Sequence, residues 1–145
     1  MKKPTLSLII IVFLTVSLFA LNKTNNWKEI AAIKKAIMDY YHEGHVQSDP
    51  ELYKNILHDE WKLFLFDDNG KLNIVDKAEY LSWYDPAKVD KTLKWKTEFY
   101  YVDVTNNMGA VKLRIGNQQF GYIDYFNLMK IDGTWWIMHK ISQPE

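Results

Sequence analysis

The spacing of apolar residues changes along the chain and divides it into a helical part followed by a strand-rich part. In the helical part, one apolar stripe is formed by Ile30, Ile33, Ile37, Tyr40, Tyr41 and Gly44. Asn26 and Glu29 occupy the N-cap and third positions of a capping box. This pattern predicts an amphipathic helix over residues 27–44 with one buried face.

Two short helices are predicted after it, over about 50–57 and 76–84, because Asp49-Pro50 and Asp76 are helix start signals. Strands are predicted over residues 61–67, 72–75, 95–104, 110–115, 119–131 and 134–142. This order predicts an α+β fold, with helices on one face of an antiparallel sheet.

Two dipeptides, Asn69-Gly70 and Asp132-Gly133, have the composition of two-residue hairpin turns. If Asp132-Gly133 forms such a turn, Ile131 lies opposite Thr134. Successive side chains of each strand then point to opposite faces of the sheet, which assigns every residue of the hairpin to one face. One predicted face carries Tyr122, Asp124, Phe126, Leu128, Trp135, Ile137, His139 and Ile141. The other carries Tyr125, Asn127, Met129, Trp136, Met138 and Lys140.

Asp124 and His139 are the polar residues of the first face, and we predict that they are diagonal neighbours on adjacent strands. A carboxylate near an imidazole is typical of an acid–base pair, so both are candidate catalytic residues. Two alternatives remain open. Asp124 can instead pair with Lys140 or Arg114, and a one-residue bulge would exchange the two faces.

Residues 1–20 differ from the rest of the chain. Lys2 and Lys3 precede an apolar stretch over residues 6–21. This layout is typical of a secretory signal peptide, and the alternative is an uncleaved membrane anchor over residues 5–21. Either form predicts export, to the periplasm or the medium, with residues 21–26 as a linker and 27–145 as the domain.

Composition narrows the function classes. The 18 basic and 18 acidic residues cancel, which argues against nucleic-acid binding, and the absence of cysteine excludes disulfides and a thiolate nucleophile. We expect no cofactor, because no phosphate-binding glycine pattern occurs. We also expect no bound metal. His42 and His45 suggest a metal site, but a helix that ends at Gly44 would separate them, and no third ligand is evident.

The last hairpin resembles a known family. Its residues follow the order Asp124-Tyr125-Phe126-x-Leu128-x-Lys130-x-Asp132-Gly133-x-Trp135-x-Ile137-x-x-Lys140. This order resembles the C-terminal signature of the nuclear transport factor 2-like superfamily, and within it the groups named putative lumazine-binding and SnoaL-like. Tyr40-Tyr41-x-x-Gly44, Ser48-Asp49-Pro50 and Leu57-His58-Asp59 resemble further family segments. The similarity spans about residues 27–142.

The resemblance implies a cone-shaped, cystatin-like fold: a curved antiparallel sheet around the long first helix, with two short helices and a pocket in the concavity. It places the candidate pair Asp124 and His139 in that pocket, together with Tyr41, His58 and Trp61. The apolar hairpin face adds Phe126 and Trp135 as pocket candidates. Tyr41 and Trp61 can instead be core residues, and His58 can be a helix C-terminal residue.

Three functions compete. The first, which we favour, is an exported module that binds a small, partly apolar molecule. The second is a cofactor-free isomerase or dehydratase, in which Asp124 or His139 moves a proton and Tyr41 donates to an oxyanion. The third is a homodimer formed through Tyr125, Met129, Trp136 and Met138, because this face is too apolar to stay in water as one patch.

Overall fold

A computed structural model describes residues 26–67 and 69–145. The predicted signal peptide or anchor, and all of the predicted linker except Asn26, lie outside the described residues, so export stays a prediction. Within the described part of the chain, no helix combines the length and apolar character needed to span a membrane.

The helices follow the predicted order, but the first is longer than expected. It runs over residues 26–36, continues as a π-helix, η1 (Ile37–His42), and ends as α2 (Glu43–Gln47). Ser48 then turns the chain with a left-handed φ of 50°. The short helices are α3 (Pro50–Tyr53), α4 (Lys77–Leu81) and the 3₁₀ turn η2 (Pro86–Lys88).

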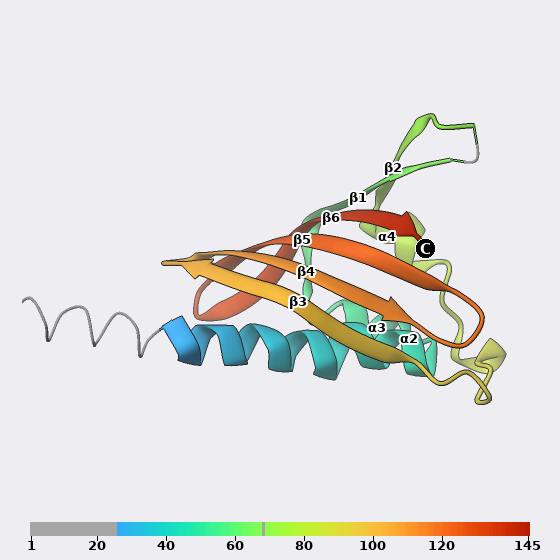
Figure 1. Ribbon diagram of the computed structural model, residues 1–145, viewed down its shortest axis with the longest axis horizontal. Coiled ribbons are helices and arrows are strands. Elements are labelled where there is room, and N and C mark those ends of the chain that lie inside the picture. Colours follow the sequence, from blue (N-terminus) through green and yellow to red (C-terminus); the bar gives the residue numbers. More distant parts are fainter. Residues whose placement is uncertain (1–25, 68) are drawn as a thin grey trace, which may run out of the picture.

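One six-stranded sheet has the order β2-β1-β6-β5-β4-β3 (Figure 1). Its strands are β1 (Leu57–Phe66), β2 (Leu72–Asp76), β3 (Lys96–Thr105), β4 (Met108–Gly116), β5 (Gly121–Ile131) and β6 (Thr134–Pro144). Neighbouring strands are antiparallel except β1 and β6, which are parallel. The α+β fold with a curved sheet around the N-terminal helix is confirmed.

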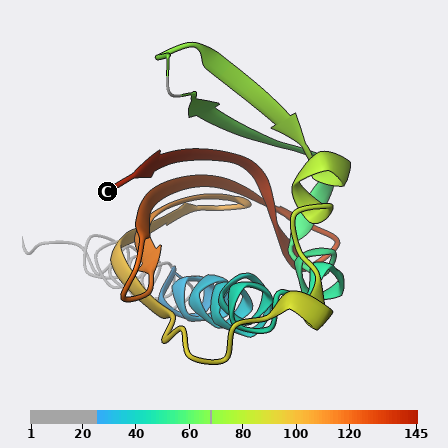
Figure 2. The same cartoon turned by 90° about the vertical axis from the view of Figure 1, so that its right-hand side faces the viewer.

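Two bulges help to curve this sheet. Tyr100 is an extra residue in β3, because Phe99 pairs with Leu113 and Tyr101 with Lys112. Met138 is an extra residue in β6, because Leu128 pairs with Ile137 and Asn127 with His139. An extra residue bends its strand and increases the local twist. Figure 2 shows the result, a sheet that curls around the first helix.

The bulge at Met138 corrects the predicted faces of the last hairpin. The turn is as predicted: Ile131 pairs with Thr134, and Asp132 and Gly133 both have positive φ. Up to Ile137 the predicted alternation holds. Beyond Met138 it is reversed.

As a result His139 is exposed on the outer face, and so is Ile141, which is 56% exposed. Lys140 and Ser142 are buried on the inner face, where Asp124 is fully buried. The prediction that Asp124 and His139 share a face is therefore wrong. The alternative pairing of Asp124 with Lys140 is confirmed, since Asp124 Oδ2 lies 3.4 Å from Lys140 Nζ.

The first helix is held against the concave face of the sheet by its apolar stripe and by the carboxylate of Glu29. Ile33, Ile37 and Tyr41 are fully buried. Glu29 was predicted to close a capping box, but its side chain accepts hydrogen bonds from Lys130 Nζ and Trp135 Nε1, both at 2.7 Å. The start of the helix is thus fixed to the last hairpin.

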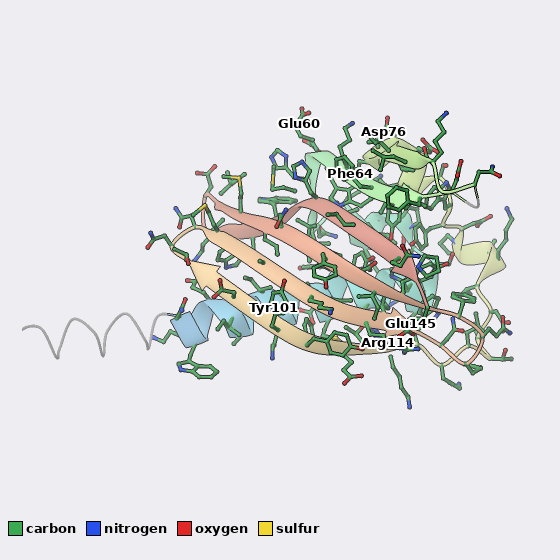
Figure 3. All side chains as sticks on the ribbon, turned by 45° about the horizontal axis from the view of Figure 1, so that its top comes forward. Glu60, Phe64, Asp76, Tyr101, Arg114 and Glu145 are labelled. Atoms are coloured by element: carbon green, nitrogen blue, oxygen red, sulfur yellow. The ribbon has the colours of Figure 1, made fainter. Side chains whose placement is uncertain are left out.

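Apolar side chains remain exposed on the outer face of the sheet (Figure 3). Of the residues predicted to form a dimer, Tyr125 and Met129 are exposed, whereas Trp136 and Met138 are half-buried. The homodimer stays a prediction. Arg114, the other proposed partner of Asp124, instead pairs with Glu145 at 2.6 Å.

We predict that Gly44→Ala destabilises the protein, although alanine favours helices by about 1 kcal/mol over glycine. A Cβ at Gly44 would lie 2.6 Å and 2.7 Å from two ring carbons of the fully buried Tyr53. Overpacking of this kind costs about 1–3 kcal/mol. Urea unfolding followed by tryptophan fluorescence measures the change. Ala32→Gly, at an exposed position of the same helix, is the control for helix propensity, and a stabilised Gly44→Ala would contradict the packing.

Candidate functional site

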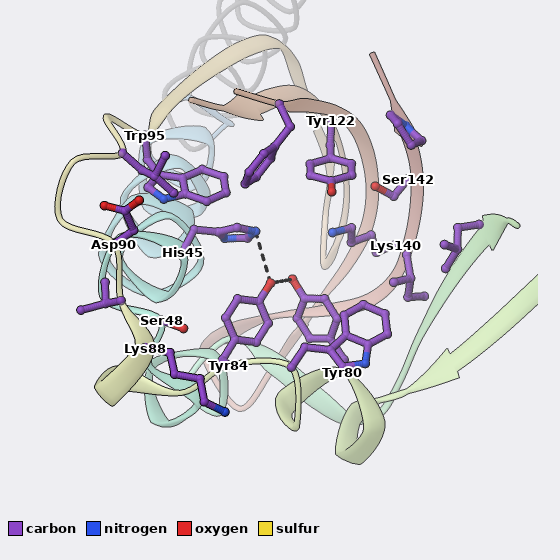
Figure 4. Close-up of a pocket in the computed structure, with 17 residues that line it drawn as sticks. His45, Ser48, Tyr80, Tyr84, Lys88, Asp90, Trp95, Tyr122, Lys140 and Ser142 are labelled. Carbon is purple, nitrogen blue, oxygen red and sulfur yellow. Dashed lines mark hydrogen bonds between the residues drawn. The ribbon is translucent and has the colours of Figure 1, made fainter. Parts of the chain in front are cut away.

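A cavity of about 420 Å³ lies between the C-terminal end of the first helix and the inner face of the sheet (Figure 4). We call it the cone pocket. It is lined by His45, Ser48, Leu63, Leu65, Tyr80, Trp83, Tyr84, Lys88, Val89, Asp90, Leu93, Trp95, Phe120, Tyr122, Lys140, Ser142 and Pro144. Trp83, Lys88, Asp90 and Phe120 are exposed, so they mark the mouth.

The inner end of the cone pocket is built on a buried polar cluster of Tyr41, Asp124, Lys140 and Ser142. Ser142 Oγ donates to Asp124 Oδ1 at 2.6 Å, and the Tyr41 hydroxyl donates to Asp124 Oδ2 at 2.8 Å. Lys140 Nζ donates to the Tyr41 hydroxyl at 2.6 Å. Of the four, Lys140 and Ser142 line the cavity, while Tyr41 and Asp124 lie behind them.

Burial dominates the electrostatics of this cluster. It lowers the pKa of the Lys140 amine, because removal from water disfavours the ammonium form, and nearby Asp124 opposes this change. Burial also raises the pKa of the Tyr41 hydroxyl well above its ordinary value, and the charge of Asp124 adds to the rise. Tyr41 therefore stays protonated and serves as a hydrogen-bond bridge between Lys140 and Asp124.

His45 forms a second polar group of the pocket wall. Its Nδ1 lies 2.9 Å from the Tyr41 carbonyl oxygen and 2.7 Å from the Tyr53 hydroxyl. A carbonyl oxygen can only accept, so we assign the proton to Nδ1. Nε2 then carries its lone pair toward the cavity, 3.4 Å from the Tyr84 hydroxyl.

His45 is neutral in this environment. Although part of its ring faces the cavity, the surrounding protein desolvates it, and this burial lowers its pKa to about 3. The charge of Lys140 acts in the same direction. The pocket therefore holds a neutral imidazole opposite a buried amine.

Tyrosine hydroxyls and aromatic walls complete the site. Tyr84 donates to the Tyr80 hydroxyl at 2.7 Å. Figure 4 shows His45, Tyr80, Tyr84 and Lys140 converging on the cavity from different elements. Farther out, the Trp95 and Phe120 rings pack edge to face with centroids 5.4 Å apart. One end of the pocket is thus polar, and its walls are largely aromatic and aliphatic.

The structure places the predicted site residues differently from the expectation. Asp124 and Tyr41 belong to the polar cluster, one layer behind the cavity surface. Trp61, Phe126 and Trp135 are buried in the core and do not line the cavity. Phe126 and Trp135 contact Tyr41 and Glu29 of the first helix, whereas Trp61 packs against Tyr80 of α4.

His58 and His139 lie away from the cavity. His58 stands at the start of β1, where its ring lies 6.2 Å from that of Trp136. His139 contacts Phe64, with ring centroids 5.8 Å apart, because the bulge turns it outward. The proposed acid–base pair of Asp124 and His139 is not formed.

Sequence reasoning did not select the polar residues of the pocket wall, among them His45, Tyr80, Tyr84, Lys140 and Ser142. His45 follows Tyr41 by four residues, so it lies on the same helix face once the helix continues past Gly44. The four-residue spacing from Tyr41 would have placed His45 in the site if the helix had been predicted to continue to residue 47. His42 instead bonds to Thr97 Oγ1 at 3.0 Å, so the two histidines have separate surroundings.

We predict that His45 makes stability depend on pH. Its folded pKa of about 3 is below the ordinary 6.5, so the unfolded chain binds the proton first as pH falls. Between pH 7 and about pH 4, the free energy of unfolding of the wild type should fall by about 2 kcal/mol more than that of His45→Gln. This value is smaller than the full pKa difference allows, because part of the ring faces the cavity. Urea unfolding of both proteins at each pH measures this, and equal pH dependence would contradict a buried neutral His45.

We also predict strong coupling between Asp124 and Lys140. Asp124→Asn leaves the buried Lys140 ammonium without its carboxylate partner, which should lower the free energy of unfolding by about 3–5 kcal/mol. Adding Lys140→Met removes the unpaired charge, so the double variant should recover much of that loss. A double-mutant cycle from urea unfolding measures the coupling. Strictly additive losses would show that the two side chains do not stabilise each other.

Comparisons with known proteins agree with the fold. A family model described as "Putative lumazine-binding" matches residues 28–142. No curated protein matches the sequence. A nuclear transport factor 2-like protein of unknown function from Shewanella baltica superposes with a TM-score of 0.71 at 20% identity, covering 81% of this chain and 94% of that one.

Two further solved structures extend the likeness. A nuclear transport factor 2-like protein of unknown function from Silicibacter pomeroyi gives a TM-score of 0.72 at 14% identity, covering 81% of this chain and 97% of that one. A cystatin-like domain of unknown function from Nostoc punctiforme gives 0.59 at 13% identity, covering 79% and 76%. At these identities the structures show the fold alone, which is the nuclear transport factor 2-like fold. The family match over residues 28–142 shows that the chain belongs to the family described as putative lumazine-binding.

Proposed function

We propose that the protein is a small-molecule-binding module whose ligand occupies the cone pocket. The cavity itself carries the proposal. Its volume of about 420 Å³ lies within the usual range for small-molecule sites of roughly 300–1,000 Å³. The residues of its inner end, such as His45, Tyr80 and Lys140, are already positioned by α2, α4 and β6, so little ordering is required there when a ligand enters.

The distribution of polar groups supports a ligand with two different ends. Lys140 Nζ and the Tyr80 hydroxyl can donate hydrogen bonds at the inner end, and the Tyr84 hydroxyl donates to Tyr80. Farther out, Trp95 and Phe120 provide flat apolar walls. We therefore expect a partly apolar, flat molecule that carries a hydrogen-bond acceptor, such as a carbonyl oxygen, on its inner edge. Lumazine, which the family description names, has fused flat rings with carbonyl oxygens and fits this chemistry.

We predict that a flat aromatic alcohol, 2-naphthalenemethanol, and lumazine both bind in the cone pocket. Isothermal titration calorimetry with each compound measures binding. Native mass spectrometry of protein purified from its own host identifies any ligand that co-purifies. Absence of binding by both compounds at millimolar concentration, together with no co-purifying molecule, would contradict the proposal.

Two adjacent residues of β1 give a matched control for location. Leu65 lines the pocket, whereas Phe66 is 59% exposed. Leu65→Trp should fill the cavity and weaken binding at least about 10-fold, equivalent to 1.4 kcal/mol. Phe66→Trp adds the same side chain to the same strand and should leave affinity unchanged. Equal effects of the two variants would place the compounds elsewhere on the protein.

A further inference from the structure

We propose that the Lys140 amine forms a reversible imine with an aldehyde or ketone held in the cone pocket between Tyr80, Tyr84 and His45. This inference rests on the proposed binding function and names the class of ligand: a flat molecule whose inner carbonyl carbon reaches Lys140. It adds a covalent step to binding.

The position of the amine favours this reaction. Lys140 is 5% exposed and lines the cavity, so its Nζ faces ligand space rather than bulk water. The Tyr41 and Tyr80 rings both stand with their centroids 5.3 Å from Nζ. With the Tyr41 hydroxyl at 2.6 Å, these rings hold the amine in one place. A positioned nucleophile next to a bound carbonyl gains the advantage of an intramolecular reaction.

The electrostatics of the cluster make the free amine accessible. Burial lowers the pKa of Lys140, as in lysines that act as nucleophiles in apolar sites. Asp124 already accepts hydrogen bonds from Ser142 and Tyr41, so these two groups hold its side chain in place while it exchanges a proton with the lysine. A buried ammonium is costly, and an apolar side chain of similar size would fill the space at lower cost if Lys140 had only a packing role.

Atoms and charge balance without an oxidant or reductant. Asp124, with Oδ2 at 3.4 Å from Nζ, takes a proton from the ammonium group, and the nitrogen lone pair attacks the carbonyl carbon. A C–N bond forms as the carbonyl π electrons move to oxygen, and this oxygen gains the proton that Asp124 took, so that Asp124 is again a carboxylate. Two of the three ammonium protons finally leave with that oxygen as water. The third stays on the iminium nitrogen, whose positive charge keeps Asp124 as its partner.

Two groups of the pocket wall can assist loss of water. The Tyr80 hydroxyl, which accepts from Tyr84 and keeps its own proton, can donate to the carbonyl oxygen. Burial raises the pKa values of both tyrosines, that of Tyr84 to about 12, and keeps both hydroxyls protonated. His45 Nε2, a neutral base facing the same cavity, can accept a hydrogen bond from the departing water. These contacts provide a donor and an acceptor at the end where the reaction would occur.

Reductive trapping tests the inference on the intact protein. The protein is incubated at pH 7 with 2-naphthaldehyde and sodium cyanoborohydride, which converts an imine into a stable amine. Intact mass and peptide mapping then count and locate the naphthylmethyl groups. We expect one group, on Lys140, at a rate at least about 10-fold above that of exposed lysines, because lysine burial lowers the pKa and raises the free-amine fraction.

Two variants separate this site from ordinary amine labelling. Lys140→Arg keeps the positive charge beside Asp124 but cannot form the imine, so the label should disappear. Lys77→Arg is the matched control. Lys77 is also a partly buried lysine paired with a carboxylate, at 2.9 Å from Asp59, but it lies outside the cone pocket. Its replacement should leave the labelling of Lys140 unchanged.

The alcohol 2-naphthalenemethanol distinguishes failure of the reaction from failure of binding. If it binds in the pocket but the aldehyde leaves Lys140 unlabelled, the imine is overturned and the binding function stands. If neither the alcohol nor lumazine binds and no molecule co-purifies, both proposals fall. Label spread evenly over exposed lysines would also overturn the imine. The peptide map of the wild-type protein decides these cases even if Lys140→Arg does not fold.

Discussion

In a regular strand Ile137 and His139 would point to the same face of the sheet, and the extra residue Met138 breaks that rule in β6. Every side chain beyond it exchanges faces. Lys140 and Ser142 turn inward to meet Asp124, while His139 and Ile141 turn outward. The polar inner end of the cone pocket therefore depends on one inserted residue. Without that insertion the same sequence would place an imidazole and an isoleucine in the interior and a lysine in water.

The polar cluster is stable only as a unit. Asp124, Lys140 and Tyr41 are each almost fully buried, and each would be costly if left without partners. Their hydrogen bonds form a connected set in which Tyr41 receives from the amine and donates to the carboxylate. Such a set holds its members in one geometry, which is what a binding or reactive site requires.

Much of the architecture could be predicted from residue patterns. The apolar stripe predicted the first helix because burial on one face imposes helical spacing, and Asp132-Gly133 predicted a turn that needs positive φ at both positions. Asn69-Gly70 was misleading, because Phe66 pairs with Leu72 and the connection spans residues 67–71. The end of the helix was also misjudged, since Gly44 is needed for close contact with Tyr53 rather than for stopping the helix.

The site itself was less predictable, because a bulge has no fixed residue signature and changes which side chains are inside. The outer wall of the cone pocket adds a different point. Residues 82–95 form much of that wall outside the sheet, attached through the Ser48 hydroxyl to Asp85 and through the Gln118 side chain to Thr92 and Lys94. Because few of the sheet's hydrogen bonds involve this segment, its exposed side chains can be replaced without breaking the strand pairing, whereas Tyr84 and Trp95 also pack against the core. The outer wall of the cavity can thus change shape while the register of the strands stays the same.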